Sequence, residues 1–194
     1  MFKLTSTKAL IGINLAVYAF TSVVGGNFLY TNREILIILG QDNRFVMSGG
    51  LWQLFTAMFI HVDLLHFLGN MLFLFIFGVR GEELFSEKEF FFIYFAGGLC
   101  GNLLTLLMGP STVSAGASGA IFGMLGACVM YLGQTLGQSI MGALMFSFFL
   151  LLITSGRQVN LFAHFGGLAA GLAIGYALAK SRKLAETSLD LISP

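Results

Sequence analysis

The residues best suited to chemistry are a serine between glycines, in the run Gly116-Ala117-Ser118-Gly119, and the histidines His66 and His164. No Asp, Glu, Lys or Arg occurs between Phe90 and Gly156, so Ser118 lies in a long uncharged stretch. Polar side chains at membrane depth are costly and often functional. A serine hydroxyl is a weak nucleophile that needs a base, and neutral histidine supplies one at physiological pH. The pattern favours a peptide-bond hydrolase that works within a membrane.

The same serine and histidine side chains could instead have structural roles. A serine inside a transmembrane helix commonly bonds back to its own helix. A buried histidine can relay protons or bind a metal, and His61, His66 and His164 together could supply three zinc ligands. His61 and His66 are five residues apart, which is poor spacing for a shared metal on one helix, so we expect no metal. Ser111 and Ser114 are alternative hydroxyls, but they lack the close glycine neighbours of Ser118.

The composition indicates a membrane protein. Of 194 residues, 57% are hydrophobic and 10% are charged, against about 25% charged in soluble domains. The mean hydropathy is +0.88. A net charge of +1 gives no sign of nucleic-acid binding. Cys100 and Cys128 lie in apolar runs and are expected to be buried thiols. We expect one domain over 1–194, with its core at 9–180 and a cytoplasmic tail at 181–194.

Six apolar segments are candidates for bilayer-spanning helices, each of which needs about 20 mainly apolar residues. The fifth is short. The first follows Lys3 and Lys8 without a clear cleavage site, so we expect a retained helix rather than a signal peptide. The predicted fold class is an all-α, polytopic bundle of six helices with a long interfacial first loop. The segments are Ala9–Val24, Val62–Val79, Phe90–Met108, Ala115–Leu132, Ile140–Ile153 and Leu161–Ala179.

The distribution of Lys and Arg predicts that both termini are cytoplasmic. With six spans, seven cations fall on the inner side and three on the outer side, which agrees with the positive-inside tendency. The inner cations are Lys3, Lys8, Arg80, Lys88, Lys180, Arg182 and Lys183, and the outer ones are Arg33, Arg44 and Arg157.

Several segments outside the spans have a predicted structure. Residues 25–61 contain the only Trp, Trp52, and the short apolar run Leu51–Ile60, which favour helices at the membrane interface. Ser86 and Glu89 have the spacing of a helix capping box. Small residues recur every four positions at Gly97/Gly101, Gly119/Gly123 and Gly167/Gly171/Gly175, a pattern that lets membrane helices pack closely.

The topology brings four polar residues to one depth. The second, fourth and sixth spans all begin on the predicted outer side, and His66, Asn70, Ser118 and His164 lie in their first turns. At about 1.5 Å per residue, each lies roughly 5–12 Å below the helix start. The first N–H groups of a helix lack acceptors within it, so the Ser118 N–H is free to stabilise an oxyanion. His66 and Asn70 share one helix face and offer further donors.

At these residues the sequence resembles the rhomboid family of intramembrane serine proteases. The resemblance covers roughly residues 9–180. It rests on Gly116-Ala117-Ser118-Gly119, Ala163-His164-Phe165-Gly166-Gly167-x-x-x-Gly171 and His66-x-x-x-Asn70, together with six spans and a long first loop.

The resemblance implies a catalytic dyad of Ser118 and His164 without a third carboxylate. It also implies an oxyanion hole formed by His66, Asn70 and the Ser118 backbone, with Phe122 stacked on the base. Supporting roles fall to Gly116 and Gly119, which would leave room for substrate backbone, and to Gly167.

The resemblance has further implications and one departure. Gly78-x-x-x-Glu82 resembles a family motif expected to make a structural contact. Trp52-Gln53 stands where the family often has Trp-Arg, which removes a loop anchor. The implied location is the bacterial inner membrane, among membrane lipid, and the implied substrates are transmembrane proteins with locally unstable helices. No cofactor is expected.

Two other functions stay open at this point. A non-catalytic rhomboid-like protein would bind transmembrane helices without cutting them. A transporter or proton channel would need polar groups through the full membrane depth, and the third to fifth spans are uncharged. For the protease, the short fifth span is a candidate lateral gate.

Overall fold

The chain folds into long helices preceded and joined by short structured segments. The structure is a computed structural model and describes residues 5–137, 141–142, 145, 149 and 159–190. The described elements are α1 (Ser6–Gly25), α2 (Arg33–Leu39), β1 (Gln41–Asp42), α3 (Asn43–Met47), α4 (Gln53–Thr56), η1 (Ala57–Phe59), α5 (Leu64–Leu84), α6 (Glu87–Thr105), η2 (Leu106–Met108), β2 (Val113–Ser114), α7 (Ser118–Leu136) and α9 (Leu161–Asp190).

Five helices among the described residues are long and apolar enough to cross a membrane, namely α1, α5, α6 with η2, α7 and α9 as far as Ala185. They match five of the six predicted spans, and the fold is the predicted all-α membrane bundle. The fifth predicted span, Ile140–Ile153, and the gate assigned to it lie largely outside the described residues. The fourth begins at Ser118 rather than Ala115, because Gly116 has φ +135°, a conformation that an α-helix does not contain.

The ends of the helices follow from local side chains. Asp63 caps α5 by accepting a hydrogen bond from the His66 N–H at 2.7 Å. Ser86 and Glu89 form the predicted capping box at the start of α6. These caps satisfy N–H groups that the first turn leaves without partners. They also fix where α5 and α6 begin.

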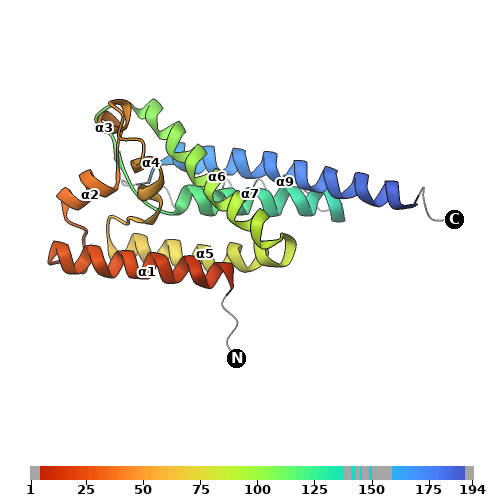
Figure 1. Cartoon of the computed structure of the whole chain (residues 1–194), viewed down its shortest axis with the longest axis horizontal. Helices are drawn as coiled ribbons and strands as arrows, with labels where there is room; N and C mark the ends of the chain where they lie inside the picture. Colours follow the sequence, from red (N-terminus) through yellow and green to blue (C-terminus); the bar gives the residue numbers. More distant parts are fainter. Residues whose placement is uncertain (1–4, 138–140, 143–144, 146–148, 150–158, 191–194) are drawn as a thin grey trace.

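Glycines bring α7 and α9 into backbone contact. A Cβ on Gly167 would overlap the Gly119 carbonyl, and a Cβ on Gly171 would overlap that of Gly123. One turn further, a Cβ on Gly175 would overlap the carbonyl of Ala127. This confirms the predicted close packing. The two helices run in the same direction, side by side, with α6 across them (Figure 1).

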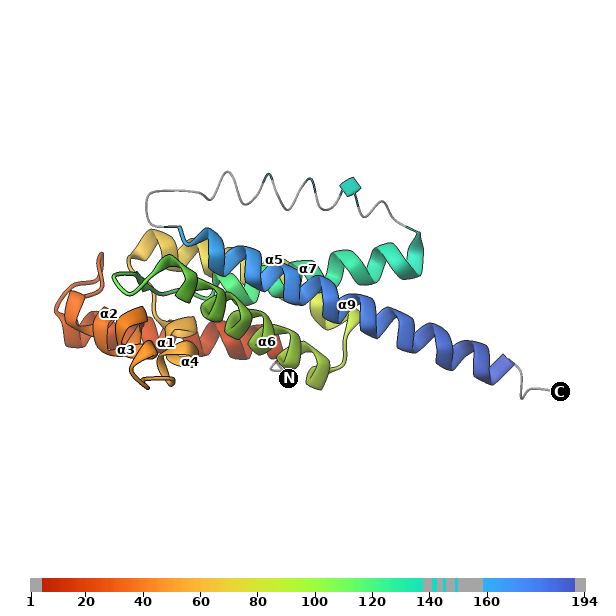
Figure 2. The same ribbon diagram turned by 90° about the horizontal axis from the view of Figure 1, so that it is seen from above.

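The segment between α1 and α5 is helical, as predicted. Its short helices α2, α3 and α4 gather at the end of the bundle where α5, α7 and α9 begin, which we call the site end (Figure 2). Unlike the prediction, it also contains a strand: β1 pairs antiparallel with β2, with Gln41 opposite Ser114. This pairing ties the first loop to the chain that leads into α7.

Gln53 holds this loop together at the position where the family often has arginine. The side chain is 1% exposed. Its Oε1 accepts from the Asp42 N–H at 2.8 Å, and its Nε2 donates to the carbonyls of Ile37 and Ile38 at 2.7 and 3.1 Å. A glutamine offers both a donor and an acceptor, so it replaces the expected anchor with an internal one.

The Gly78-x-x-x-Glu82 motif joins α5 to α1. A Cβ on Gly78 would lie 2.7 Å from the Thr7 hydroxyl, and Glu82 Oε1 accepts from the Thr7 N–H at 2.6 Å. The motif therefore makes the structural contact that the resemblance implied.

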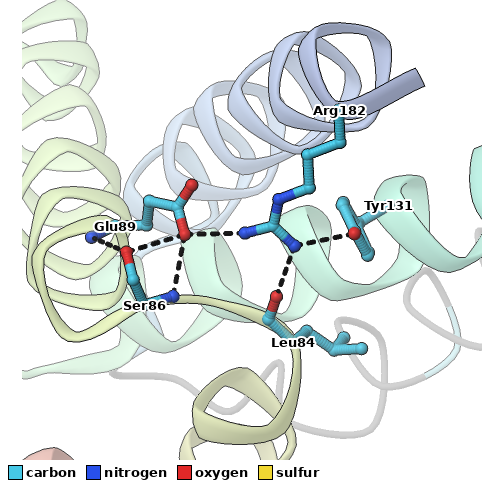
Figure 3. A network of polar contacts seen from close by, with 5 residues as sticks. All are labelled: Leu84, Ser86, Glu89, Tyr131 and Arg182. Carbon is cyan, nitrogen blue, oxygen red and sulfur yellow. Dashed lines mark hydrogen bonds and ion pairs between the residues drawn. The ribbon is translucent and has the colours of Figure 1, made fainter. Parts of the chain in front are cut away.

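The opposite end of the bundle, which we call the far end, is held by Arg182 (Figure 3). Its guanidinium donates to the Leu84 carbonyl at 2.9 Å, to the Tyr131 hydroxyl at 2.7 Å and to Glu89 Oε2 at 2.8 Å. Glu89 Oε2 also accepts from the Ser86 N–H at 2.7 Å. The expected cytoplasmic tail at 181–194 is helical as far as Asp190, because α9 continues to that residue, and Arg182 within it contacts α5, α6 and α7.

Candidate active site

A cavity of about 470 Å³ opens at the site end between α5, α7 and α9. Its lining includes all four predicted polar residues, His66, Asn70, Ser118 and His164. The remaining wall is mainly apolar, with Phe73, Phe77, Ile121, Phe122, Leu125 and Ala163 among its residues. A concave, apolar pocket with a few convergent polar groups is the usual form of a binding or catalytic site.

Ser118 is the first residue of α7, directly after its N-cap residue Ala117. Its N–H therefore belongs to the set that finds no acceptor within the helix. Gly116 brings the chain to this point with φ +135°, a conformation that residues with a side chain rarely adopt. A Cβ on Gly116 would lie 2.8 Å from His66 Cε1. Glycine here permits both the turn and the approach of the imidazole.

Gly119 lies against the start of α9. A Cβ at this position would lie 3.3 Å from the Ala163 carbonyl oxygen on α9. A side chain at either flanking glycine would therefore meet atoms of the protein itself, His66 for Gly116 and Ala163 for Gly119. Gly119 and Gly167 share the role of bringing α7 and α9 together.

His164 lies in the first turn of α9 and is 4% exposed. Its ring stacks on Phe122 with centroids 4.4 Å apart and an interplanar angle of 24°, the contact that the resemblance implied. Phe122 is one turn beyond Ser118 on α7, so the stacking turns the imidazole toward the helix that carries the serine. Within residues 5–137 and 159–190, no hydrogen bond joins Ser118 to His164. Catalytic hydrogen bonds often tighten only when substrate binds.

His66 and Asn70 lie one turn apart on α5. The Asn70 amide donates one hydrogen bond to the His66 carbonyl at 2.8 Å. An amide nitrogen carries two hydrogens, and this bond uses one of them. The His66 ring lies against Gly116, two residues before Ser118. Both side chains thus reach the neighbourhood of the serine from the facing helix.

His61 is buried next to His66. Its side chain is 1% exposed, and its ring meets those of His66 and Phe67 at 5.4 and 5.3 Å between centroids. Burial, and after it the neighbouring His66, lowers the pKa of His61 to about 3. A neutral His61 is a packing residue next to His66. Among the described residues, no group of three or more His, Cys, Asp and Glu side chains is arranged to hold a metal.

Asn160 is a site residue that sequence reasoning missed. It precedes α9 and lines the cavity, where its amide donates to the hydroxyls of Thr105 and Ser114 at 2.8 and 2.9 Å. Ser114, weighed above as an alternative nucleophile, is thus a hydrogen-bond acceptor for Asn160. The position of Asn160 just before an apolar span is typical of a helix N-cap, and that signal could have found it.

The sequence matches the pattern of the rhomboid domain over residues 48–181. It is 31% identical over 179 residues to Rhomboid-like protease 3 of Toxoplasma gondii, covering 86% of this chain and 68% of that one. It is 34% identical to the mitochondrial RHOMBOID-like protein 6 of Arabidopsis thaliana, covering 83% of this chain and 55% of that one.

A bacterial relative is also similar. The sequence is 30% identical over 185 residues to Rhomboid protease GluP of Bacillus subtilis, covering 91% of this chain and 35% of that one. The chain thus spans about one third of that protein's length, and a little over half to two thirds of the other two. The matched pattern includes the helices that line the cavity, and the chain is a member of the rhomboid family of membrane proteins.

Proposed function

We propose that this chain is an intramembrane serine protease that uses a dyad of Ser118 and His164. One observation carries the proposal: the only serine flanked closely by glycines and a histidine stacked on Phe122 line one cavity at the site end of the bundle. The family relatives that are named proteases support the reaction class.

The proposed reaction begins when Ser118 Oγ attacks the scissile carbonyl carbon and His164 accepts the hydroxyl proton. The carbonyl oxygen becomes an oxyanion that accepts hydrogen bonds from the Ser118 N–H, the His66 ring and the second Asn70 amide hydrogen. His164 then protonates the leaving amine, and the acyl group stays on Ser118. Water, deprotonated by His164, releases the acyl group and restores the serine.

The proposed substrates are membrane proteins with a transmembrane helix that unwinds easily. A peptide bond inside an intact helix is shielded by its own hydrogen bonds, so cleavage requires local unwinding. In the orientation that the cations predict, both termini are cytoplasmic and the site end lies toward the outer face of a bacterial inner membrane. Water from that side would then reach Ser118.

Cleavage of a model single-pass substrate in liposomes tests the proposal. Wild type should release two fragments, whereas Ser118→Ala and His164→Ala should release none and still fold. Ser111→Ala is the matched control, because this exposed serine lies outside the cavity. Cleavage by Ser118→Ala, or binding of the substrate by wild type without cleavage, would contradict the proposal. The second result would favour a non-catalytic helix-binding protein.

A further inference from the structure

The start of α9 is tied to two other segments by one side chain. Asn160 Oδ1 accepts from the Ala163 N–H at 3.0 Å, which caps the helix, and the Asn160 carbonyl accepts from the His164 N–H at 3.2 Å. The amide nitrogen of Asn160 donates to Thr105 Oγ1 at the end of α6 and to Ser114 Oγ in β2. Both amide hydrogens and the amide oxygen are therefore engaged.

These bonds connect the helix of the base to the segment of the nucleophile. Ser114 lies four residues before Ser118 and is held by β1 through its pairing with Gln41. Thr105 is 0% exposed, and its hydroxyl donates onward to the Gly101 carbonyl at 2.9 Å. Asn160 thus joins the end of α6 and strand β2 to the first turn of α9.

We propose that Asn160 is a positioning residue that sets His164 against Ser118, a role that rests on the proposed protease function. His164 lies one helical turn from Asn160, about 6 Å along the axis. A shift of the helix start therefore moves the imidazole directly. Because a misplacement of about 1 Å can lower a catalytic rate about 10²-fold, the two donated hydrogen bonds should affect catalysis more than substrate binding.

Helix capping alone is the competing explanation, and the two roles use different atoms of Asn160. Asn160→Asp keeps the capping oxygen and loses the donors to Thr105 Oγ1 and Ser114 Oγ. Thr105→Val removes the first of these bonds from the other side and leaves the cap intact. Thr105→Ser keeps the hydroxyl that accepts from Asn160, so its rates should be close to those of wild type. Thr112→Val is the matched control, because the Thr112 hydroxyl donates to the Met108 carbonyl at 3.2 Å, away from Asn160.

The measurements are kcat and KM for the model substrate and the rate at which a fluorophosphonate labels Ser118. We expect Asn160→Asp and Thr105→Val each to lower kcat and the labelling rate about 10- to 100-fold, with KM within about twofold of wild type. The double variant should lose no more than Asn160→Asp alone, because Asn160→Asp already removes the bond to Thr105 Oγ1. Both variants should lose some stability, because each removes at least one buried hydrogen bond, so their rates are compared well below their own unfolding temperatures.

Wild-type rates in both Asn160→Asp and Thr105→Val would overturn the positioning role. So would rate losses that disappear once each variant is assayed well below its own unfolding temperature, because that pattern belongs to a purely structural cap. If wild type itself is not labelled at Ser118, the proposed function fails instead. The two failures are therefore distinguishable.

Discussion

The two ends of α9 are anchored by different chemistry. At the site end the amide of Asn160 bonds two hydroxyls beside the cavity. At the far end Arg182 bonds Glu89, Tyr131 and a backbone carbonyl, and its guanidinium lies 4.9 Å from the centre of the Tyr131 ring. Both anchors tie α9 to α6. A neutral anchor next to the cavity avoids burying a charge among apolar side chains, whereas a partly exposed ion pair carries little desolvation penalty.

The comparison suggests that one helix separates catalysis from anchoring. Changes at the site end should alter the reaction rate, and changes at the far end should alter only stability. Changes in helix packing between the two ends should lower both stability and reaction rate. The effect on the rate should be larger the closer the change lies to His164.

The largest expected effect is that of His164→Ala. Loss of the proposed base should lower kcat about 10³-fold or more, measured by cleavage of a model substrate. Phe165→Leu is the control, since Phe165 is the next residue along α9 and is 63% exposed. Equal rates in His164→Ala and wild type would show that His164 is not the general base.

Gly167→Ala should combine a loss of stability with a loss of rate. The new Cβ meets the Gly119 backbone, which cannot move aside easily, so the free energy of unfolding should fall by about 1–3 kcal/mol. Gly175→Ala meets Ala127 in the same way near the far end and should reduce stability without a comparable loss of rate per folded molecule. Gly12→Ala, with nothing near its Cβ, should be close to neutral. Matched rate losses at Gly167 and Gly175 would contradict the separation.

Acid should weaken the site end through His61. Its pKa of about 3 in the folded state lies below the ordinary 6.5, so the unfolded state binds more protons between these values. The contribution of His61 to the free energy of unfolding is therefore fully present above pH 6.5. It falls as the pH drops, by about 1–2 kcal/mol between pH 6.5 and 5. His61→Gln should remove this part of the pH dependence of unfolding. An unchanged slope in that variant would show that other groups cause it.

Arg182→Met should have the smallest effect. The ion pair with Glu89 is partly exposed, so the loss should be about 1 kcal/mol of unfolding free energy. The value of kcat at 25 °C should stay at the wild-type level. A large fall in kcat with little change in stability would mean that the far end also sets the geometry of the site.

The sequence predicted the parts of this molecule that depend on local pattern. Ser118, His164, His66 and Asn70 occur at the starts of apolar segments, and helix direction alone brings those starts together. The capping box at Ser86 and the glycine spacing of α7 and α9 are likewise local signals. They were read correctly because each depends on residues within one helix.

The rest depends on contacts between distant segments. The pairing of β1 with β2 joins residues about 70 positions apart and holds the chain that leads into α7. The sequence alone predicts that Gln53 removes an anchor. Its partners, Asp42 and Ile37, come close only in the folded loop, so the anchoring role of Gln53 appears only in the structure. The contacts of Arg182 cannot be predicted from its place among the inner cations, because its three partners come from three other segments.

The central claim is that Ser118 is a nucleophile activated within this cavity. The most direct test is to treat the full chain in detergent or liposomes with a fluorophosphonate and to locate the adduct by mass spectrometry. The account predicts a single adduct on Ser118 in wild type and none in Ser118→Ala. An adduct on another serine, or no adduct in a preparation that cleaves its substrate, would contradict it.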